Sequence, residues 1–204
     1  MLELRNIDCI RGARTLFSGL DLRLQPGQLL RVQGANGAGK TSLLRLICGL
    51  LAPARGEVLW RGERLADLRE EFGRELVYIG HAAALKDDLS ALENLRTAAL
   101  LGGHAATPAA ARAALASAGL GGRETTPARL LSQGQRRRLA LARLLIGAPP
   151  LWVLDEPFDA LDSSALQWLR ELIAGHLGRG GIVVLSSHQE VALDTGLAPM
   201  VVAL

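Results

Sequence analysis

Apolar residues occur in two patterns along this chain. In some segments they alternate with polar residues, which predicts half-buried strands, and in others they form short continuous runs, which predict strands buried on both faces of a parallel sheet. Clusters such as "QPGQ" separate these segments and predict turns. The expected strands are Leu2–Cys9, Asp21–Leu24, Leu29–Gln33, Val58–Arg61, Glu75–Ile79, Leu151–Glu156 and Gly181–His188.

Other segments have apolar residues at helical spacing and recognisable helix starts. Ser90 with Glu93, and Ser132 with Gln135, have the spacing of capping boxes. Thr107 followed by a proline also predicts a helix start. The expected helices begin at Lys40 and stop near Gly49, begin at Ser90, run from Thr107 to Gly119, begin at Ser132, and run from Ser163 to Leu177.

The order of these elements predicts the fold class. Strands alternate with helices on both sides of a helical block, which is typical of an α/β protein with a parallel-sheet core and a helical insertion. We therefore expect a single domain over residues 1–204. Its core should comprise approximately residues 1–82 and 148–204, and the helical subdomain approximately residues 83–147.

Composition excludes several classes of protein. With 49% hydrophobic and 21% charged residues the chain is globular rather than disordered, and a net charge of +3 does not require a nucleic-acid partner. Cys9 and Cys48 lie in apolar surroundings, so we expect buried thiols in a reducing cytoplasm. No signal peptide is expected, and the longest apolar run, Leu144–Leu154, is too short to span a membrane.

The segment "GANGAGKT", Gly34–Thr41, lies between an expected strand and an expected helix and has the pattern of a phosphate-binding loop. Its glycines let successive N–H groups turn towards phosphate oxygens, and the helix amino terminus adds its positive dipole end. Lys40 would reach the β- and γ-phosphates of a nucleoside triphosphate, and the Thr41 hydroxyl would bind Mg²⁺. The candidate ATP-binding residues here are Gly34, Ala35, Asn36, Gly37, Ala38, Gly39, Lys40, Thr41 and Ser42.

Two adjacent carboxylates follow the apolar run "LWVL". Asp155, at the carboxyl end of the expected strand, can hold Mg²⁺ through water, and Glu156 can orient or deprotonate an attacking water. Neighbouring side chains on a strand point in different directions, so the two carboxylates can serve different roles. Together with the phosphate loop, they predict a nucleotide-hydrolysing site.

The order of "GANGAGKT", "LSQGQ", "LDEP", "ALD" and "SSH" resembles that of the nucleotide-binding domains of ATP-binding cassette (ABC) proteins, over essentially the whole chain. The resemblance implies a P-loop NTPase fold with a RecA-like parallel-sheet core, N-terminal antiparallel strands and an inserted helical subdomain. It also implies a homodimer in which the signature of one subunit faces the ATP on the phosphate loop of the other. The signature residues are then Ser132, Gln133, Gly134 and Gln135.

The same resemblance implies roles for other residues. Lys40, Glu156 and His188 become the catalytic residues, and His188 would contact the γ-phosphate and help to position the water. Asp159 and Asp162 would belong to the loop that contacts the partner subunit.

Three positions depart from the family pattern. Gln133 replaces a signature glycine, and His81 stands where the family usually has a glutamine. The aromatic residue that typically stacks on adenine aligns near Arg11, where the chain has no ring. The guanidinium plane of an arginine can also stack on a base, so Arg11 is a candidate ATP-binding residue.

Arg136, Arg137 and Arg138 could form a nucleic-acid patch, a solvated face, or part of a nucleotide-binding signature. Successive helical residues point about 100° apart, so three in a row cannot form one flat patch. No aromatic residues interleave with them, as a base-stacking platform would require. We therefore favour solvation or pairing between domains over nucleic-acid contact.

Within the ABC proteins, the segments "YIGH", "LKDDLSALENL", "LSQGQRRRLALARLL", "LWVLDEPFDALD" and "VVLSSHQ" resemble the ATPase subunits of the haem exporter of bacterial cytochrome c maturation. This resemblance implies a peripheral protein on the cytoplasmic face of the inner membrane, bound to integral membrane subunits. Hydrolysis of ATP to ADP and phosphate would release a haem-loaded periplasmic chaperone, which is an indirect partner. No nucleic-acid partner is expected.

Other readings of the sequence stay open. A cytosolic ABC ATPase could act on nucleic acid or ribosomes, although such proteins usually carry a long coiled-coil insertion or two tandem cassettes. A nucleotide-binding module could also switch without hydrolysing ATP. Separately, Leu85, Leu89 and Leu92 could line a groove for a membrane subunit or simply pack the helical block.

Overall fold

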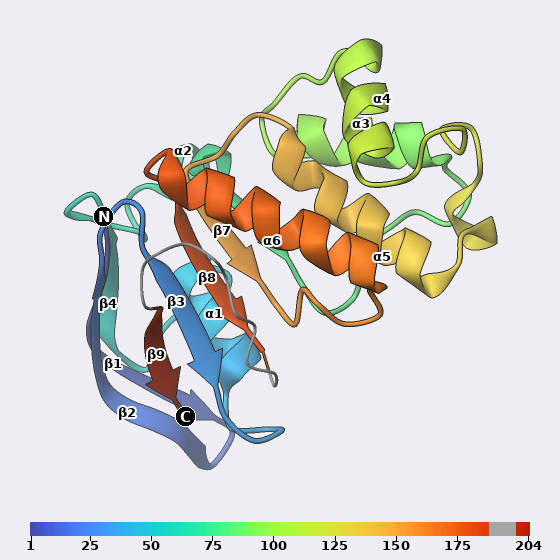
Figure 1. Ribbon diagram of the computed structural model, residues 1–204. Helices are drawn as coiled ribbons and strands as arrows, with labels where there is room; N and C mark the ends of the chain where they lie inside the picture. The colour runs from blue at the N-terminus through green and yellow to red at the C-terminus, as the bar shows by residue number, and fades with distance from the viewer. Residues whose placement is uncertain (188–198) are drawn as a thin grey trace.

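The structure, a computed structural model, describes residues 1–187 and 199–204. His188 lies outside the described residues, so its expected role stays a prediction. The described strands form two sheets, with orders β2-β1-β4-β5 and β6-β7-β8-β3-β9 (Figure 1). The strands are β1 (Leu2–Arg11), β2 (Arg14–Leu24), β3 (Leu29–Gln33), β4 (Arg55–Trp60), β5 (Glu63–Arg64), β6 (Leu76–Ile79), β7 (Leu151–Leu154), β8 (Ile182–Ser186) and β9 (Met200–Ala203).

The first sheet is antiparallel and the second is parallel. In the parallel sheet β8 lies between β3 and β7, and β6 flanks β7. All these strands run in the same direction, so the segments that follow them lie together at the carboxyl ends of the strands. The phosphate loop, the two carboxylates and His81 are thereby brought to the same place.

The helices are α1 (Lys40–Ile47), α2 (Arg69–Glu75), α3 (Ala91–Leu101), α4 (Pro108–Ser117), α5 (Gln133–Leu141) and α6 (Ser163–Gly178), with short 3₁₀ turns at Ala128–Leu130 and Ala142–Leu145. Helix α1 packs between the two sheets, and α6 covers the other face of the parallel sheet (Figure 1). Helices α3, α4 and α5 form the helical block, which has an apolar cluster of its own.

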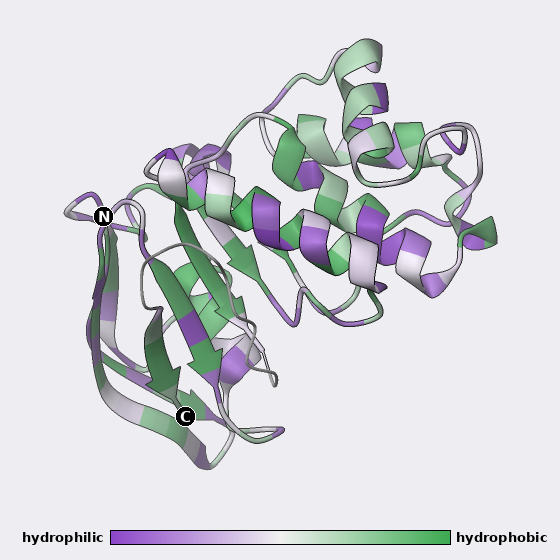
Figure 2. Ribbon diagram, in the orientation of Figure 1, coloured by the Kyte–Doolittle hydropathy of each residue, from purple (hydrophilic) through white to green (hydrophobic). Residues whose placement is uncertain are grey.

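Period-two alternation explains why the parallel strands are buried on both faces. Leu151 and Val153 of β7 face α1 and the antiparallel sheet, whereas Trp152 and Leu154 face α6. The hydropathy colouring of Figure 2 shows the consequence for β7 and β8, along which hydrophilic colour is nearly absent. Helix α6 instead mixes apolar and polar residues, because only one side of it is buried.

The expected helix starts are confirmed. Ser90 and Ser132 each cap a helix with the reciprocal hydrogen bonds of a capping box, and the Thr107 hydroxyl accepts a hydrogen bond from the N–H of Ala110. The sequence pattern did not predict α2, β5, β9 or the 3₁₀ turns, and β1 and β2 extend further towards their shared turn than expected. No described helix is long and apolar enough to cross a membrane.

A buried asparagine fixes the segment that leads into the helical block. The Asn94 amide nitrogen donates to the carbonyl oxygens of Lys86, Leu89 and Ser90, at 2.9, 3.0 and 3.1 Å, and its side-chain oxygen accepts from the N–H of Lys86 at 2.8 Å. The side chain therefore stands in for the backbone partners that this irregular segment lacks.

His176 of α6 is buried against the parallel sheet. Its ring stacks on Trp152 with 3.7 Å between ring centroids, and its Nε2 lies 3.3 Å from the carbonyl oxygen of Pro150. A Cβ on Gly181 would come within 2.1 Å of the ring, so this site needs a glycine. Burial disfavours the imidazolium and lowers the pKa of His176 from 6.5 to about 4.

We expect this histidine to weaken the fold in acid. Between about pH 6.5 and about pH 4 the unfolded histidine binds a proton that the folded one does not, so the free energy of unfolding falls as the pH drops. The contribution is on the order of 3 kcal/mol. His176→Phe keeps a ring over Trp152, so its urea unfolding should lose about that much less stability across this range. His81→Gln, which removes an exposed imidazole, is the control; identical pH dependence in wild type and His176→Phe would contradict the assignment.

Candidate functional site

A cavity of about 690 Å³ opens at the carboxyl ends of the parallel strands, and we call it the strand-end cavity. Its wall combines the phosphate loop, the segments after β6 and β7, and the tip of the β1–β2 hairpin. Cavities of roughly 300–1,000 Å³ are typical of small-molecule sites. The lining residues are Arg11, Arg14, Leu16, Asn36, Gly37, Gly39, Lys40, Thr41, Ser42, His81, Asp155, Glu156 and Asp159.

The phosphate loop adopts a conformation that its sequence makes possible. Gly39 precedes α1 with φ +117°, and a Cβ there would lie 3.2 Å from the Cβ of Leu16 and 3.3 Å from the ring of Phe17. Glycine is therefore required both for the backbone angle and for the close approach of β2. The first N–H groups of a helix have no intrahelical partners, and such groups bind anions at helix amino termini.

Lys40 lies over this loop. Its Nζ donates to the carbonyl oxygens of Gly34 and Ala35, at 2.9 and 3.3 Å, and it is 4.0 Å from Oε1 of Glu156. Gly34, Ala35 and Ala38 belong to the loop but do not line the cavity, unlike the other residues expected to bind ATP in this segment. The buried ammonium group therefore lies between the loop and a carboxylate.

A hydrogen-bond network joins three strand ends beside the cavity. The Thr41 hydroxyl donates to Oδ2 of Asp155 at 2.8 Å, and the Ser186 hydroxyl donates to Oδ1 of the same carboxylate at 2.7 Å. Ser186 in turn accepts from the N–H of Glu156 at 2.9 Å. Ser186 belongs to the "SSH" segment but is not among the site residues predicted from the sequence.

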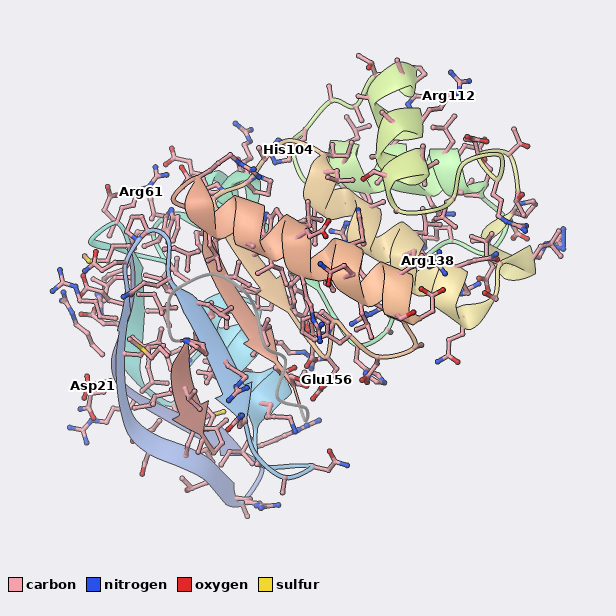
Figure 3. The ribbon with its side chains drawn as sticks, viewed as in Figure 1. Asp21, Arg61, His104, Arg112, Arg138 and Glu156 are labelled. Atoms are coloured by element: carbon pink, nitrogen blue, oxygen red, sulfur yellow. The ribbon has the colours of Figure 1, made fainter. Side chains whose placement is uncertain are left out.

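Glu156 is directed differently from its neighbour, but not through strand alternation, because β7 ends at Leu154 and not at Glu156 as expected. It lies at the end of the sheet (Figure 3), with only 8% of its surface exposed, and its carboxylate points to the Lys40 side of the cavity. Its backbone has φ +48°, in the left-handed region that a residue with a Cβ rarely occupies. Such a conformation persists only where the surroundings impose it, and it often marks a functional position.

Arg137 supplies much of that constraint. It is 6% exposed, and its guanidinium donates to the carbonyl oxygens of Gly80 at 2.9 Å, Asp155 at 2.8 Å and Glu156 at 2.6 Å. Burial lowers the pKa of Arg137, while the carboxylates of Asp159, Asp155 and Glu156 act in the opposite direction. The predicted solvated role is wrong for this residue, whereas its hydrogen bonds do pair the helical block with the core.

The two neighbouring arginines point elsewhere. Arg136 donates to Oδ1 of Asp87 at 2.7 Å and to the carbonyl oxygen of Ala128 at 2.9 Å. Arg138, labelled in Figure 3, pairs with Asp162, which also caps α6. Each of the three arginines thus binds different residues of the chain, and the three form no common patch.

The signature segment does not reach the strand-end cavity of its own chain. Of the described residues that line this cavity, none belongs to the group Ser132–Gln135. Ser132 and Gln133 are exposed, and a Cβ on Gly134 would lie 3.0 Å from the carbonyl oxygen of Ala160. The signature is therefore packed against the 159–162 loop and open to solvent.

A second hollow, of about 510 Å³, adjoins the first, and we call it the side groove. Thr41, His81 and Asp155 line both hollows. Leu85, Leu89 and Leu92 do not line the side groove, and Leu85 and Leu92 pack against the apolar cluster of the helical block. This contact favours packing of the helical block for Leu85 and Leu92, and the docking role of Leu89 stays a prediction. The other lining residues are Arg45, Tyr78, Ile79, Gly80, Ala82, Ala83, Ala84 and Arg143.

Comparisons with known proteins agree with this geometry. The ABC transporter family matches residues 17–159. A protein of Dechloromonas aromatica (strain RCB) is 50% identical over 196 residues, which cover 96% of each chain. One from Methylococcus capsulatus (strain ATCC 33009 / NCIMB 11132 / Bath) is 55% identical over 188 residues, covering 92% of this chain and 90% of the relative. Both are named cytochrome c biogenesis ATP-binding export protein CcmA.

Solved structures show the same fold. The ATP-binding subunit of an ABC transporter superposes with a TM-score of 0.82 at 30% identity, over 92% of this chain and 79% of that one. A dimeric ATP-binding cassette in a post-hydrolysis state, bound to ADP and Pi, gives 0.82 at 25% identity, over 93% and 88%. The chain therefore belongs to the ABC transporter family, among the cytochrome c biogenesis ATP-binding export proteins.

Proposed function

We propose that the chain is the ATP-hydrolysing subunit of a haem exporter in cytochrome c biogenesis and that the strand-end cavity is its ATPase site. Its family is one of ATP-binding cassettes, and its near full-length relatives carry the cytochrome c biogenesis name. The observation that carries the proposal is the network that joins Thr41, Asp155 and Glu156 beside the phosphate loop.

The described residues suggest separate roles in phosphate binding and in hydrolysis. The N–H groups of the loop and of the start of α1 bind the phosphates, and Lys40 neutralises the charge on the β- and γ-phosphates. Glu156 accepts a proton from water while the water oxygen bonds to the γ-phosphorus and the bond to the bridging oxygen breaks. The products are ADP and phosphate. His188 would contact the γ-phosphate.

Mg²⁺ is the cofactor that this site would hold. The Thr41 hydroxyl and the Asp155 carboxylate, 2.8 Å apart, are hard oxygen ligands of the kind that Mg²⁺ prefers. The described residues contain no cluster of three or more His, Cys, Asp or Glu side chains suited to a metal, and Mg²⁺ bound with a nucleotide needs only one or two carboxylates. When bound, the ion would neutralise phosphate charge.

The active form would be a homodimer with two composite sites. Ser132 and the amino end of α5 form an anion-binding helix terminus that faces away from the cavity of its own chain. A second copy would close this terminus over the γ-phosphate, with Asp159 and Asp162 near the contact. The division into a core of about 1–82 and 148–204 and a helical subdomain of about 83–147 is part of this proposal.

The membrane partners are inferred in the same way. Relatives named as export proteins suggest integral membrane subunits of a haem exporter, and hence a peripheral position on the cytoplasmic face of the bacterial inner membrane. Release of a haem-loaded periplasmic chaperone would be the indirect result of ATP hydrolysis. The side groove is the place where we expect a segment of a membrane subunit to bind. Nothing in the three arginines favours nucleic acid, because each is engaged within the chain.

Glu156→Gln should abolish turnover but keep nucleotide binding. Glutamine preserves the shape and cannot accept the proton, so the ATPase rate should fall by at least about 100-fold. In ATP and Mg²⁺ the variant should accumulate as a dimer in size-exclusion chromatography. Glu171→Gln, which alters an exposed carboxylate of α6, is the matched control. Unchanged turnover in Glu156→Gln would refute the assignment of the base.

Arg137 should act as a positioning residue. Lysine keeps the charge of Arg137 but cannot reach three carbonyl oxygens with a planar fork, so Arg137→Lys should lower kcat about tenfold and change the KM for ATP by less than about twofold. Arg136→Lys, at the neighbouring position, should leave kcat unchanged. A lowered melting temperature with wild-type kcat would mean that the role of Arg137 is only structural.

A large side chain placed in the side groove tests whether a membrane subunit binds there. Ala82 is exposed and lines the groove, so Ala82→Trp should reduce co-purification with the membrane subunits while ATP binding persists. Ala105→Trp places the same ring at an exposed position of the helical block and should co-purify normally. Equal co-purification of both variants would show that the partner binds elsewhere.

A further inference from the structure

Ser186 places a hydroxyl group at the end of an otherwise apolar strand. It is the last residue of β8, it has no exposed surface, and the four residues before it are buried apolar side chains. In the parallel register Leu185 pairs with Leu154, so Ser186 lies beside Asp155, the residue that follows β7. A polar side chain buried at this point needs hydrogen-bond partners.

This hydroxyl group uses both its donor and its acceptor. Its oxygen donates to Oδ1 of Asp155 at 2.7 Å and accepts from the N–H of Glu156 at 2.9 Å. Because a hydroxyl has only one proton, the bond to Asp155 leaves the oxygen lone pairs for Glu156. Ser186 thus bridges the residue proposed to hold Mg²⁺ and the residue proposed to act as the base.

The carboxylate of Asp155 is held from two sides. Thr41, in the first turn of α1, donates to Oδ2 at 2.8 Å, and Ser186 donates to Oδ1. The two bonds fix the rotation of the carboxylate, whose oxygens can accept about four hydrogen bonds and so keep capacity for an ion. Hydrogen bonds of this kind orient a ligand before the metal binds, and Mg²⁺ demands near-ideal geometry.

Glu156 depends on the same hydroxyl group through its backbone. Its φ of +48° lies in the left-handed region, and the bond from its N–H to Ser186 is one of the contacts that keep it there. Without the hydroxyl, this buried N–H would lose its acceptor, and the backbone would be free to relax. The carboxylate would then move relative to Lys40, and a displacement of about 1 Å can slow a reaction about 100-fold.

We propose that Ser186 is a positioning residue of the ATPase reaction, which sets the affinity for Mg²⁺ through Asp155 and the placement of the base through Glu156. Ser186 does not line the strand-end cavity, so it acts through these two residues and not by contact with the nucleotide. No bond of Ser186 forms or breaks in the reaction. The inference rests on the proposed ATPase function and adds a residue to it.

Three substitutions test the bridge in the purified full chain. Ser186→Ala deletes the hydroxyl, and Ser186→Cys supplies only a weak donor and acceptor at similar volume. In both variants the kcat for ATP, measured by phosphate release, should fall about tenfold or more, while the KM for ATP changes by less than about twofold. Ser186→Thr keeps the hydroxyl and suits a strand, so its kcat should stay within about threefold of wild type.

Nucleotide binding gives a second measurement that needs no turnover. Calorimetry yields the Kd of ADP in EDTA and in saturating Mg²⁺, and the ratio of the two values reports how far the ion tightens binding. Ser186→Ala should lower this ratio about fivefold and leave the Kd in EDTA unchanged, because only the metal-bound complex depends on the orientation of Asp155.

Val184→Ala is the matched control for damage to β8. Val184 is fully buried two residues earlier on the same face of the strand, in the apolar cluster between the two sheets. Its truncation leaves a cavity, so the melting temperature should fall at least as far as in Ser186→Ala. The kcat and the Mg²⁺ ratio of Val184→Ala should stay at their wild-type values.

The outcomes separate this inference from the function on which it rests. A wild-type chain that neither binds nor hydrolyses ATP would refute the ATPase function itself. Wild-type turnover with an unchanged kcat in Ser186→Ala would overturn the effect on the base, and an unchanged Mg²⁺ ratio would overturn the effect on the metal. Equal losses in Val184→Ala, or in Ser186→Thr, would show that Ser186 only supports the strand.

Discussion

The buried guanidinium of Arg137 is the contact on which the geometry of the site depends. A charge removed from water must be compensated by hydrogen bonds, and here the compensation comes from three backbone carbonyl groups. Two of them belong to consecutive peptide units that carry Asp155 and Glu156, and the third belongs to Gly80. Loss of the guanidinium would leave all three acceptors without this donor, so the constraint acts on the carboxylates and on the segment before His81 together.

The left-handed backbone of Glu156 shows why such a constraint is needed. A residue with a Cβ held in this region costs on the order of 1–3 kcal/mol, so the surroundings must impose it. Arg137 fixes the carbonyl group of this residue, and Ser186 fixes its N–H group. The strain turns the side chain of Glu156 away from that of Asp155, and the two adjacent carboxylates thereby reach different parts of the cavity. One side chain lies beside Thr41 and the other beside Lys40.

Local signals in the sequence predicted much of this arrangement, and non-local contacts account for the rest. Capping boxes and glycine-rich loops can be predicted correctly because the residues that interact in them lie within a few positions of each other. The hydrogen-bond partners of Arg137 could not be predicted from local sequence. Its acceptors are up to 57 positions away, and the residues on both sides of it are also arginines. The short strand β9 likewise owes its existence to pairing with β3. Two interpretations stayed open for Leu85 and Leu92, because a pattern of apolar residues shows that a face is buried and does not show what it packs against.

The two hollows share a wall, and this links the nucleotide to whatever occupies the side groove. Thr41, His81 and Asp155 line both, so a ligand that moves any of these side chains changes the shape of both hollows. Arg137 ties the peptide before His81 to the peptides that carry the carboxylates, so a displacement of the groove segment would act on Asp155 and Glu156 through one group. Because binding free energies are linked reciprocally, a partner that favours the nucleotide-bound geometry must itself bind more tightly when the nucleotide is present. The coupling therefore needs no long pathway through the protein; it requires only that the side groove and the ATPase site continue to share these residues.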